Sequence, residues 1–406
     1  MAELAQGEAN SAPFTEQDRH WMRRAIELAE RGLYSTAPNP RVGCVLVREG
    51  QIIGEGWHRA AGQAHAEIEA LNAAKNEVTG ATVYVTMEPC SHHGRTAPCA
   101  DALIKAGVTR IIAATADPSE KVSGRGFARL ERAGIGCRVG LEASAAEALN
   151  PGFTSIAVRK RPWLRLKLAA SIDGRTAMAN GESQWITGSP ARADVQHWRA
   201  RSSAILTGAG TVLRDQPRLC VREEELTPEH RSRHSEAVRQ PARIIVTTRG
   251  GVTPNAQMLE RGGPILLMGA GAAKTDDTQS ENLPRHPLKD PARGVSETRV
   301  EVEHVPLNCG PAGVDLREVL AELAAREYHE VLAECGATLA GSLLSAGLVD
   351  ELLLYLAPCA LGDSARPLAH LPGLEHMQDR LRFTLNDVRQ FGNDVRLQLT
   401  PVLHSN

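Results

Sequence analysis

The first 160 residues alternate between segments with the apolar period of a helix and short runs with the period of a strand. A helix is expected from the capping sequence Thr15-Glu-Gln-Asp18 to near Gly32, with apolar side chains on one face. Two strands joined by a glycine-containing turn follow, and then helices and strands alternate, which predicts a layered α/β unit. The further expected strands are 41–47, 51–57, 81–87, 110–115 and 136–139, and the further expected helices are 65–75, 97–106, 126–133 and 142–160.

A basic connection, Val158-Arg-Lys-Arg-Pro162, separates this unit from a second alternation of strands and helices. We therefore expect two domains, residues 1–160 and residues 161–406, each long enough to bury its own core. In the second domain Asp173-Gly174 predicts a tight turn, and Ser189-Pro190 is expected to be the N-cap and first residue of a helix. The expected strands are 163–169, 204–207, 329–334 and 351–356, and the expected helices are 189–201, 315–325 and 338–346.

Glycine-containing turns follow two of the expected strands of the second domain. One strand runs into Gly208-Ala-Gly-Thr211 and another into Cys335-Gly336. Backbone amides at a helix start beyond such a turn can bind phosphate, and a glycine that only ends a strand is the equal alternative. The sequence has no G-x-G-x-x-G after a first strand, so the pattern alone gives an α/β domain of unknown ligand. The polar, proline-containing stretches 223–240 and 271–298 are expected to be long surface loops.

The residues with the most specific chemistry are His65, Glu67, Cys90 and Cys99. One imidazole and two thiolates supply the three protein ligands of a catalytic zinc ion, which keeps its fourth position for water. Glu67 lies two residues after the histidine at an expected helix start, where its carboxylate can shuttle protons without binding the metal. Zinc lowers the pKa of water to about 7, so these residues predict a hydrolytic deaminase that releases ammonia and leaves a carbonyl.

Two other interpretations of these residues remain open at this point. A structural zinc site would need a fourth ligand, for which His92 or His93 could serve, and it would leave Glu67 unexplained. A zinc-stabilised nucleotide-binding module is the non-enzyme alternative. Substitution of Glu67 separates these alternatives, because only a deaminase needs that carboxylate for turnover.

The composition argues against several classes of partner. Lys and Arg total 46 against 48 for Asp and Glu, a formal net charge of −2, and aromatic residues make up 3%. Nucleic acid is not expected as a partner, because its binding favours a basic surface and stacking rings. Residues 1–15 are polar and no run reaches the roughly 18 apolar residues of a membrane span, so we expect no membrane partner and a cytoplasmic protein. The eight cysteines are scattered through a long chain, which indicates reduced thiols.

The spacing of the cysteines narrows the class of deaminase. Eight residues separate Cys90 from Cys99, whereas nucleoside, nucleotide and tRNA deaminases usually have Pro-Cys-x-x-Cys. This spacing counts against the other enzyme alternative, such a deaminase with an unrelated second domain. The segment from Glu88 to Cys99 and the upstream Pro38-Asn-Pro-Arg-Val-Gly43 resemble the deaminase half of the bifunctional deaminase/reductase family of riboflavin biosynthesis. The resemblance implies a cytidine-deaminase-like layered α/β fold for this half, and substrate contacts at Asn39, His58, His92 and Arg95.

The second half resembles the reductase half of the same family. The matching segments are Lys167–Ala177, Gly181–Thr187, Gly208–Leu213 and Glu334–Leu339. The resemblance implies a dihydrofolate-reductase-like α/β domain that uses NADPH. It implies cofactor contacts at Ala169, Trp185, Thr211, Asp215, Thr247 or Thr248, and the turn of Gly336, Ala337, Thr338, Leu339, Ala340, Gly341 and Ser342. It implies substrate contacts at Ser183, Arg199, Leu219, Arg222 and Glu334, where guanidinium groups suit a phosphate.

The two resemblances together imply one bifunctional enzyme that uses Zn²⁺ and NADPH. The first half would remove the pyrimidine 2-amino group of 2,5-diamino-6-(5-phosphoribosylamino)pyrimidin-4(3H)-one by hydrolysis. The second half would reduce the ribosyl side chain to give 5-amino-6-(5-phosphoribitylamino)uracil. The expected partner is a small pyrimidine ribose phosphate, and the sequence is also compatible with a homo-oligomer.

Overall fold

A computed structural model describes residues 13–75, 77–91, 98–119, 123–233, 238–270, 300–311 and 313–402. The chain divides into two compact units between Lys160 and Arg161, with a short stretch from Glu229 grouped with the first unit. Each unit is described by itself below. Within the described residues, no helix has the length and apolar character needed to cross a lipid bilayer.

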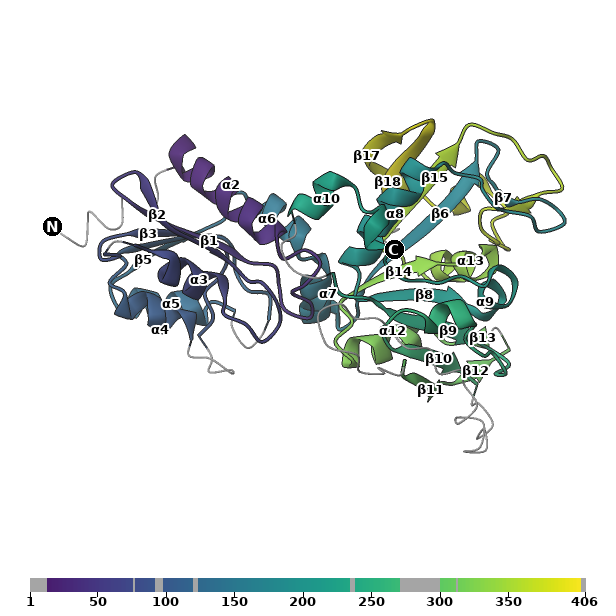
Figure 1. Ribbon diagram of the computed structural model, residues 1–406, viewed down its shortest axis with the longest axis horizontal. Helices are drawn as coiled ribbons and strands as arrows, with labels where there is room; N and C mark the ends of the chain where they lie inside the picture. The colour runs from purple at the N-terminus through teal and green to yellow at the C-terminus, as the bar shows by residue number, and fades with distance from the viewer. Residues whose placement is uncertain are drawn as a thin grey trace. The chain divides into compact units, whose positions relative to one another are not determined.

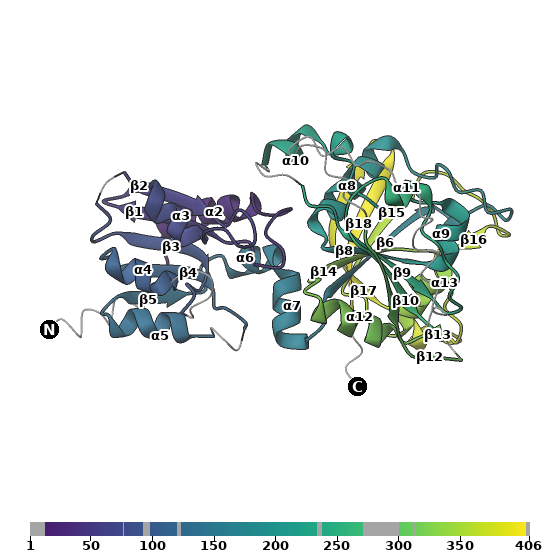
Figure 2. The ribbon, with the colours of Figure 1, turned by 60° about the horizontal axis from the view of Figure 1, so that its bottom comes forward.

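The first unit is built on a five-stranded sheet with the order β2-β1-β3-β4-β5 (Figure 1 and Figure 2). β1 pairs antiparallel with both β2 and β3, and the pairs β3–β4 and β4–β5 are parallel. The predicted hairpin of the first two strands is confirmed, and Glu49 and Gly50 at its turn have positive φ angles of 54° and 73°. The strands are β1 Gly43–Arg48, β2 Gln51–Trp57, β3 Thr82–Met87, β4 Arg110–Thr115 and β5 Gly136–Val139.

Helices cover both faces of this sheet (Figure 1). Alternate residues of each strand point to opposite faces, so Val83 and Val85 pack in one core and Tyr84 in the other. The first core includes residues of α3, α4 and α5, and the second includes residues of α2 and α6. The helices are α2 Glu16–Glu30, α3 Ala66–Ala73, α4 Cys99–Lys105, α5 Arg125–Arg132, α6 Ala143–Leu149 and α7 Pro151–Arg159.

The prediction of a single helix over residues 142–160 is wrong, because the chain forms two helices that meet at Asn150. Asn150 has a φ of −123°, and Pro151 starts the second helix. A proline fits the first position of a helix and breaks one in its interior. The Asn150 side chain accepts a hydrogen bond from the backbone nitrogen of Arg41 at 2.8 Å and donates to its carbonyl oxygen at 2.9 Å. The break therefore anchors the loop that carries Asn39.

The second unit is built on a nine-stranded sheet with the order β11-β10-β9-β8-β14-β6-β15-β18-β17 (Figure 1). The seven strands from β11 to β15 are parallel, and β18 and β17 add an antiparallel edge. The strands are β6 Trp163–Ser171, β8 Ala204–Gly208, β9 Ala242–Thr247, β10 Ile265–Gly269, β11 Val302–Pro306, β14 Glu330–Glu334, β15 Glu351–Ala357, β17 Phe383–Phe391 and β18 Asp394–Pro401. Two small sheets pair β7 Arg175–Ala177 with β16 Arg366–Pro367 and β12 Cys309–Gly310 with β13 Gly313–Val314.

Helices also cover both faces of the larger sheet. Residues of α12 and α13 pack on one face, and residues of α8, α9 and α11 pack on the other. The predicted N-cap at Ser189 is wrong by one residue, since Gly188 is the N-cap and Ser189 is the first helical residue. The predicted loop over 223–240 includes short helices, and the predicted loop over 271–298 lies outside the described residues. The helices are α8 Ser189–Arg201, α9 Ala209–Asp215, α10 Pro228–Arg233, α11 Ala256–Leu259, α12 Leu316–Ala325 and α13 Ala337–Ser345, with 3₁₀ turns at Glu223–Glu225 and Met377–Asp379.

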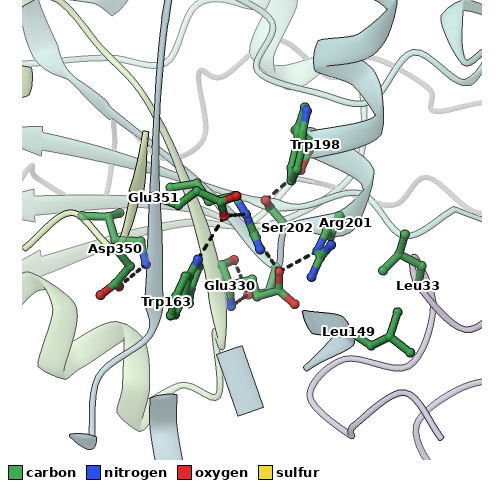
Figure 3. Close-up of polar contacts among 12 residues, drawn as sticks. Leu33, Leu149, Trp163, Trp198, Arg201, Ser202, Glu330, Asp350 and Glu351 are labelled. Atoms are coloured by element: carbon green, nitrogen blue, oxygen red, sulfur yellow. Dashed lines mark hydrogen bonds and ion pairs between the residues drawn. The ribbon is translucent and has the colours of Figure 1, made fainter. Parts of the chain in front are cut away.

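A buried network of charged groups links the starts of the central strands of the second unit. Figure 3 shows Glu351 accepting a hydrogen bond from the Trp163 ring at 3.2 Å and Glu330 accepting one from Arg201 at 2.9 Å. Arg165 lies between the two carboxylates, 2.5 Å from Glu351 and in an ion pair with Glu330. The network connects β6, β14 and β15 to the end of α8, away from the carboxyl ends of the strands.

Candidate active sites

Helix α3 carries the first two predicted site residues onto the sheet of the first unit. His65 is its N-cap, and Glu67 lies in its first turn with 3% of its surface exposed. A Cβ at Gly56 of β2 would collide with the carbonyl oxygen of Ala66, and one at Gly54 would collide with that of Ala70. Larger residues at these two positions would push the helix, and with it His65 and Glu67, away from the sheet.

The structure brings His65, Cys90 and Cys99 together. Nδ1 of His65 lies 3.6 Å from Sγ of Cys90 and 3.3 Å from Sγ of Cys99, and the three ligand atoms lie within 4.8 Å of one another. Tetrahedral zinc, with bonds of about 2.0 Å to nitrogen and about 2.3 Å to sulfur, holds these two atoms roughly 3.5 Å apart. The donor set therefore fits zinc, with Nδ1 as the ring nitrogen that would bind it.

The electrostatics of this cluster suit a catalytic site. Hydrogen bonding from Cys99, together with a weaker contribution from His65, outweighs burial and lowers the pKa of the Cys90 thiol. A thiolate is the form of cysteine that binds a metal. Burial and then the charge of Cys90 raise the pKa of Glu67 to about 7. A carboxyl group that titrates near neutral pH can accept a proton and return it.

Asn39 and His58 lie beside the metal-ligand cluster. The His58 ring packs edge-on against the His65 ring, with 5.4 Å between the ring centroids. Nδ1 of His58 lies 3.0 Å from the carbonyl oxygen of Ala64, and its Nε2 lies 3.0 Å from Nδ2 of Asn39. A carbonyl oxygen accepts and an amide nitrogen donates, so His58 carries its proton on Nδ1. Burial lowers the pKa of His58, which favours the neutral ring.

The two glycine-containing turns of the second unit lie side by side, because β8 and β14 are neighbouring parallel strands. A Cβ on Gly336 would lie 3.9 Å from Oγ1 of Thr211, and a Cβ on Gly208 would lie 3.5 Å from Leu339. Gly336 is the N-cap of α13, and no side chain among the described residues caps that helix. Its first backbone amides are therefore open to a ligand, which suits a phosphate group of a nucleotide.

A cluster of charged side chains lies at the same edge of the sheet. Arg199 of α8 donates two hydrogen bonds to the Glu334 carboxylate, at 2.6 and 2.8 Å, and a third to the carbonyl oxygen of Cys220 at 3.1 Å. Lys167 of β6 lies opposite Glu334 in the register of the two strands. Burial lowers the pKa of Lys167. Burial also acts to raise the pKa of Glu334, but the charge and hydrogen bonds of Arg199, with the charges of Lys167 and Arg222, together outweigh burial and lower that pKa. The edge thus holds an ionised carboxylate beside two basic side chains.

The other predicted contacts of the second unit come from several elements. Ala169 lies in β6, Thr247 ends β9, Asp215 ends α9, and Ser183 precedes α8. The Trp185 ring is 69% exposed, and the Arg192 guanidinium lies 4.3 Å from its centroid. Arg222 pairs with Glu225 at 2.5 and 2.8 Å. Leu219 is buried and has a positive φ of 46°.

Comparison with known proteins places both units. Residues 15–115 match the family described as "Cytidine and deoxycytidylate deaminase zinc-binding region", and residues 162–397 match "RibD C-terminal domain". The riboflavin biosynthesis protein RibD of Escherichia coli K12 is 46% identical over 94% of this chain and 99% of its own length. The chain belongs to the RibD family. The Haemophilus influenzae member is 42% identical over 96% of this chain and 98% of its own.

Solved structures of the RibD family share the fold over nearly the whole chain. Acinetobacter baumannii RibD is 43% identical with a TM-score of 0.81, covering 96% of this chain and 99% of its own. A Thermotoga maritima protein described as a diaminohydroxyphosphoribosylaminopyrimidine deaminase/5-amino-6-(5-phosphoribosylamino)uracil reductase is 28% identical with a TM-score of 0.78, covering 95% and 99%. The predicted family and the predicted pair of α/β folds, one cytidine-deaminase-like and one dihydrofolate-reductase-like, are therefore confirmed.

Sequence reasoning about the RibD site did not single out Lys167, although its segment was recognised. A signal was present, because Leu164-Arg-Leu-Lys-Leu168 places two cations in a strand that is otherwise apolar. Central parallel strands are usually apolar on both faces, so a charge there calls for a partner. The predicted substrate contacts His92 and Arg95 lie outside the described residues.

Proposed function

We propose that this chain is a bifunctional enzyme of riboflavin biosynthesis that joins a zinc-dependent deaminase to an NADPH-dependent reductase. One observation carries the proposal: His65, Cys90 and Cys99 surround a space of zinc dimensions beside the buried Glu67, in a chain that continues into a RibD C-terminal domain. The structural-zinc alternative does not account for Glu67, whose carboxyl group titrates near neutral pH beside the ligands. Full-length coverage by RibD relatives argues against a deaminase with an unrelated second domain.

In the deaminase, His65, Cys90 and Cys99 would hold zinc, which makes water nucleophilic near neutral pH. Glu67 takes a proton from the attacking water and delivers it to the departing amine of the diaminopyrimidine. Water oxygen bonds to the ring carbon that bears the 2-amino group, the carbon–nitrogen bond breaks, and ammonia leaves a carbonyl behind. Asn39 and the neutral His58 offer polar groups to the pyrimidine, with His92 and Arg95 as the further proposed contacts.

In the reductase, NADPH supplies the hydride that converts the ribosyl chain to a ribityl chain. The segment from Gly336 to Ser342 forms the start of α13, and its first backbone amides, with Thr211 of α9, would bind phosphate groups of the cofactor. Ala169, Trp185, Asp215 and Thr247 are the other proposed cofactor contacts. Arg199 holds the Glu334 carboxylate in place through two hydrogen bonds. Glu334 and the neighbouring Lys167 would then orient the substrate.

The substrate contacts are proposed at Ser183, Arg199, Leu219, Arg222 and Glu334. Arg222 pairs with a glutamate that is 40% exposed, so a substrate phosphate can replace that partner at little cost. Arg199 donates to the Glu334 carboxylate from Nε and Nη2, one edge of its guanidinium, so it orients that carboxylate as well as supplying a positive charge. We also propose a cytoplasmic location, because the eight cysteines are free and a reducing compartment keeps them so.

A coupled assay tests the proposed function. The full chain with zinc is given 2,5-diamino-6-(5-phosphoribosylamino)pyrimidin-4(3H)-one, and ammonia release and NADPH oxidation are followed together. We expect one ammonia released and one NADPH oxidised per molecule of product. Ammonia release without NADPH oxidation would contradict the reductase assignment, and failure to release ammonia would contradict the deaminase assignment.

A further inference from the structure

Glu88 directly follows β3 and lies two residues before the candidate zinc ligand Cys90, and its carboxylate is bound by backbone amides of another part of the chain. One oxygen accepts from the nitrogens of Gly126 at 2.8 Å and Phe127 at 3.4 Å. The other accepts from Gly124 at 2.9 Å and Asp117 at 3.2 Å. Glu88 is 4% exposed, so its charge is compensated by these amides inside the unit.

Three of these four amides, those of Gly124, Gly126 and Phe127, belong to the start of helix α5, which lacks a cap of its own. Its N-cap residue is Gly124, and no side chain from within the helix start caps it. Glu88, which follows strand β3, supplies the cap instead. A negatively charged carboxylate at the start of a helix is the arrangement that the helix dipole favours. A Cβ at Gly126 would collide with the carbonyl oxygen of Pro89, so the helix start also packs directly on the residue before Cys90. The position of Cys90 is thereby tied to the position of α5.

One turn further along, Arg129 ties the same helix to the segments around both thiol ligands. Its guanidinium donates to the carbonyl oxygen of Ser91, the residue after Cys90, at 3.4 Å. It also pairs with Asp101 of α4 at 2.5 and 2.8 Å. Asp101 lies two residues after Cys99, the first residue of that helix. Helix α5 therefore contacts the chain on both sides of Cys90 and beside Cys99.

We propose that Glu88 and Arg129 are positioning residues that set the separation of the two thiolate ligands, an inference that rests on the proposed zinc site. Cys90 follows β3 and Cys99 is the first residue of α4, and the negative charges of the two thiolates repel one another. Holding both segments on one helix lowers the cost of ordering them when the metal binds. Mutation of groups that orient metal ligands typically lowers metal affinity by about 10- to 100-fold. We call this arrangement the α5 clamp.

The test compares Glu88→Gln with Glu131→Gln, and Arg129→Gln with Arg132→Gln, in the full zinc-loaded chain. The two variants of each pair make the same chemical change. The control residues Glu131 and Arg132 lie in α5 and are exposed. Zinc transfer to a chromophoric chelator gives the release rate. The absorption spectrum of the cobalt(II)-substituted protein reports the geometry of the thiolate ligands, which a general loss of stability would not change. NADPH oxidation with the deaminated substrate verifies that the second unit is intact.

We expect Glu88→Gln to release zinc at least about 10-fold faster than wild type, with an altered cobalt spectrum. Arg129→Gln should change the zinc release rate and the cobalt spectrum in the same direction but by a smaller amount. The two control variants should match wild type. If Glu88→Gln does not fold, Arg129→Gln decides the question. Wild-type release rates and spectra in the folded clamp variants would overturn the α5 clamp while leaving the zinc site standing. Wild-type protein that binds no zinc would instead contradict the proposed function, and the clamp with it.

Discussion

Among single residues, Glu67 can be changed without removing a metal ligand. The Glu67→Gln variant keeps His65, Cys90 and Cys99, so it should retain about one zinc per chain. It loses the group that moves the proton, and deaminase turnover should fall by about 10²- to 10⁴-fold. Metal analysis and an ammonia-release assay on the same preparation measure the two effects. Full activity in this variant would show that the carboxylate has no part in the reaction.

The thiol ligands should behave in the opposite way. Cys90→Ser or Cys99→Ser removes one of three protein ligands, so zinc and ammonia release should be lost together. Cys309→Ser is the matched control, because Cys309 is exposed and lies in the second unit. Metal analysis after gel filtration measures the loss. A serine variant that keeps both zinc and activity would remove that cysteine from the ligand set.

The zinc site could be predicted from the sequence because its residue types are rarely combined for any other purpose. His65, Glu67, Cys90 and Cys99 have a spacing that only one kind of chemistry explains well. The α5 clamp could not be predicted in this way, since Glu88 acts on backbone amides nearly 40 residues further along the chain. Contacts between a side chain and a distant backbone leave no pattern in a single sequence.

The helices and strands of the first unit could be predicted because local features of the sequence agree with the way these elements pack. The nearly continuous burial of β1 and β3 and the capping box at Thr15 can be read from short apolar and polar runs, and they agree with a sheet that helices cover on both faces. In the second unit, β9, β10 and β11 are parallel neighbours, but the sequence separates β10 and β11 by a long polar stretch that obscures their pairing. The order of the nine strands depends on such long-range pairs, which periodicity does not reveal.

The buried network between β6, β14 and β15 should matter more for stability than an exposed ion pair of the same type. Arg165→Met leaves Glu351 and Glu330 without the cation between them, both at most 7% exposed. Removing one partner of a buried pair costs about 3 to 5 kcal/mol, so the free energy of unfolding should fall by that order. Arg326→Met is the control, because its ion pairs with Glu303 and Glu322 are partly exposed and worth less than about 1 kcal/mol.

Urea unfolding at pH 7 and pH 4 measures the difference in free energy of unfolding between wild type and Arg165→Met, and shows in which direction that difference changes with pH. Burial acts to raise the pKa of Glu351, but the charges of Arg165 and Arg201, with hydrogen bonds from Trp163 and Arg165, together lower it below its value in the unfolded chain. Stability from this group is present above the unfolded pKa of about 4.3 and is lost as the pH falls through the lower, folded value. The gap between wild type and Arg165→Met should therefore narrow from pH 7 to pH 4. An unchanged gap would show that the network contributes through packing alone.

On the scale of the whole molecule, two activities are joined in one chain whose two units have separate sheets and separate cores. The candidate zinc ligands all belong to the unit that ends at Lys160, and Arg199, Arg222 and Glu334 all belong to the one that begins at Arg161. Domains with their own cores fold as units, so a substitution at one site should not reduce the activity of the other.

Separability of the two sites follows as a prediction. Glu67→Gln should stop ammonia release and leave NADPH oxidation at the wild-type rate when the deaminated phosphoribosylaminouracil is supplied. The double variant Arg199→Ala, Arg222→Ala should weaken reduction without changing zinc content or ammonia release, because it removes two cations and frees Glu334 from its bidentate partner. Loss of both activities in both variants, with the fold verified by circular dichroism, would refute independent sites. It would indicate that residues of both units contribute to one composite active site.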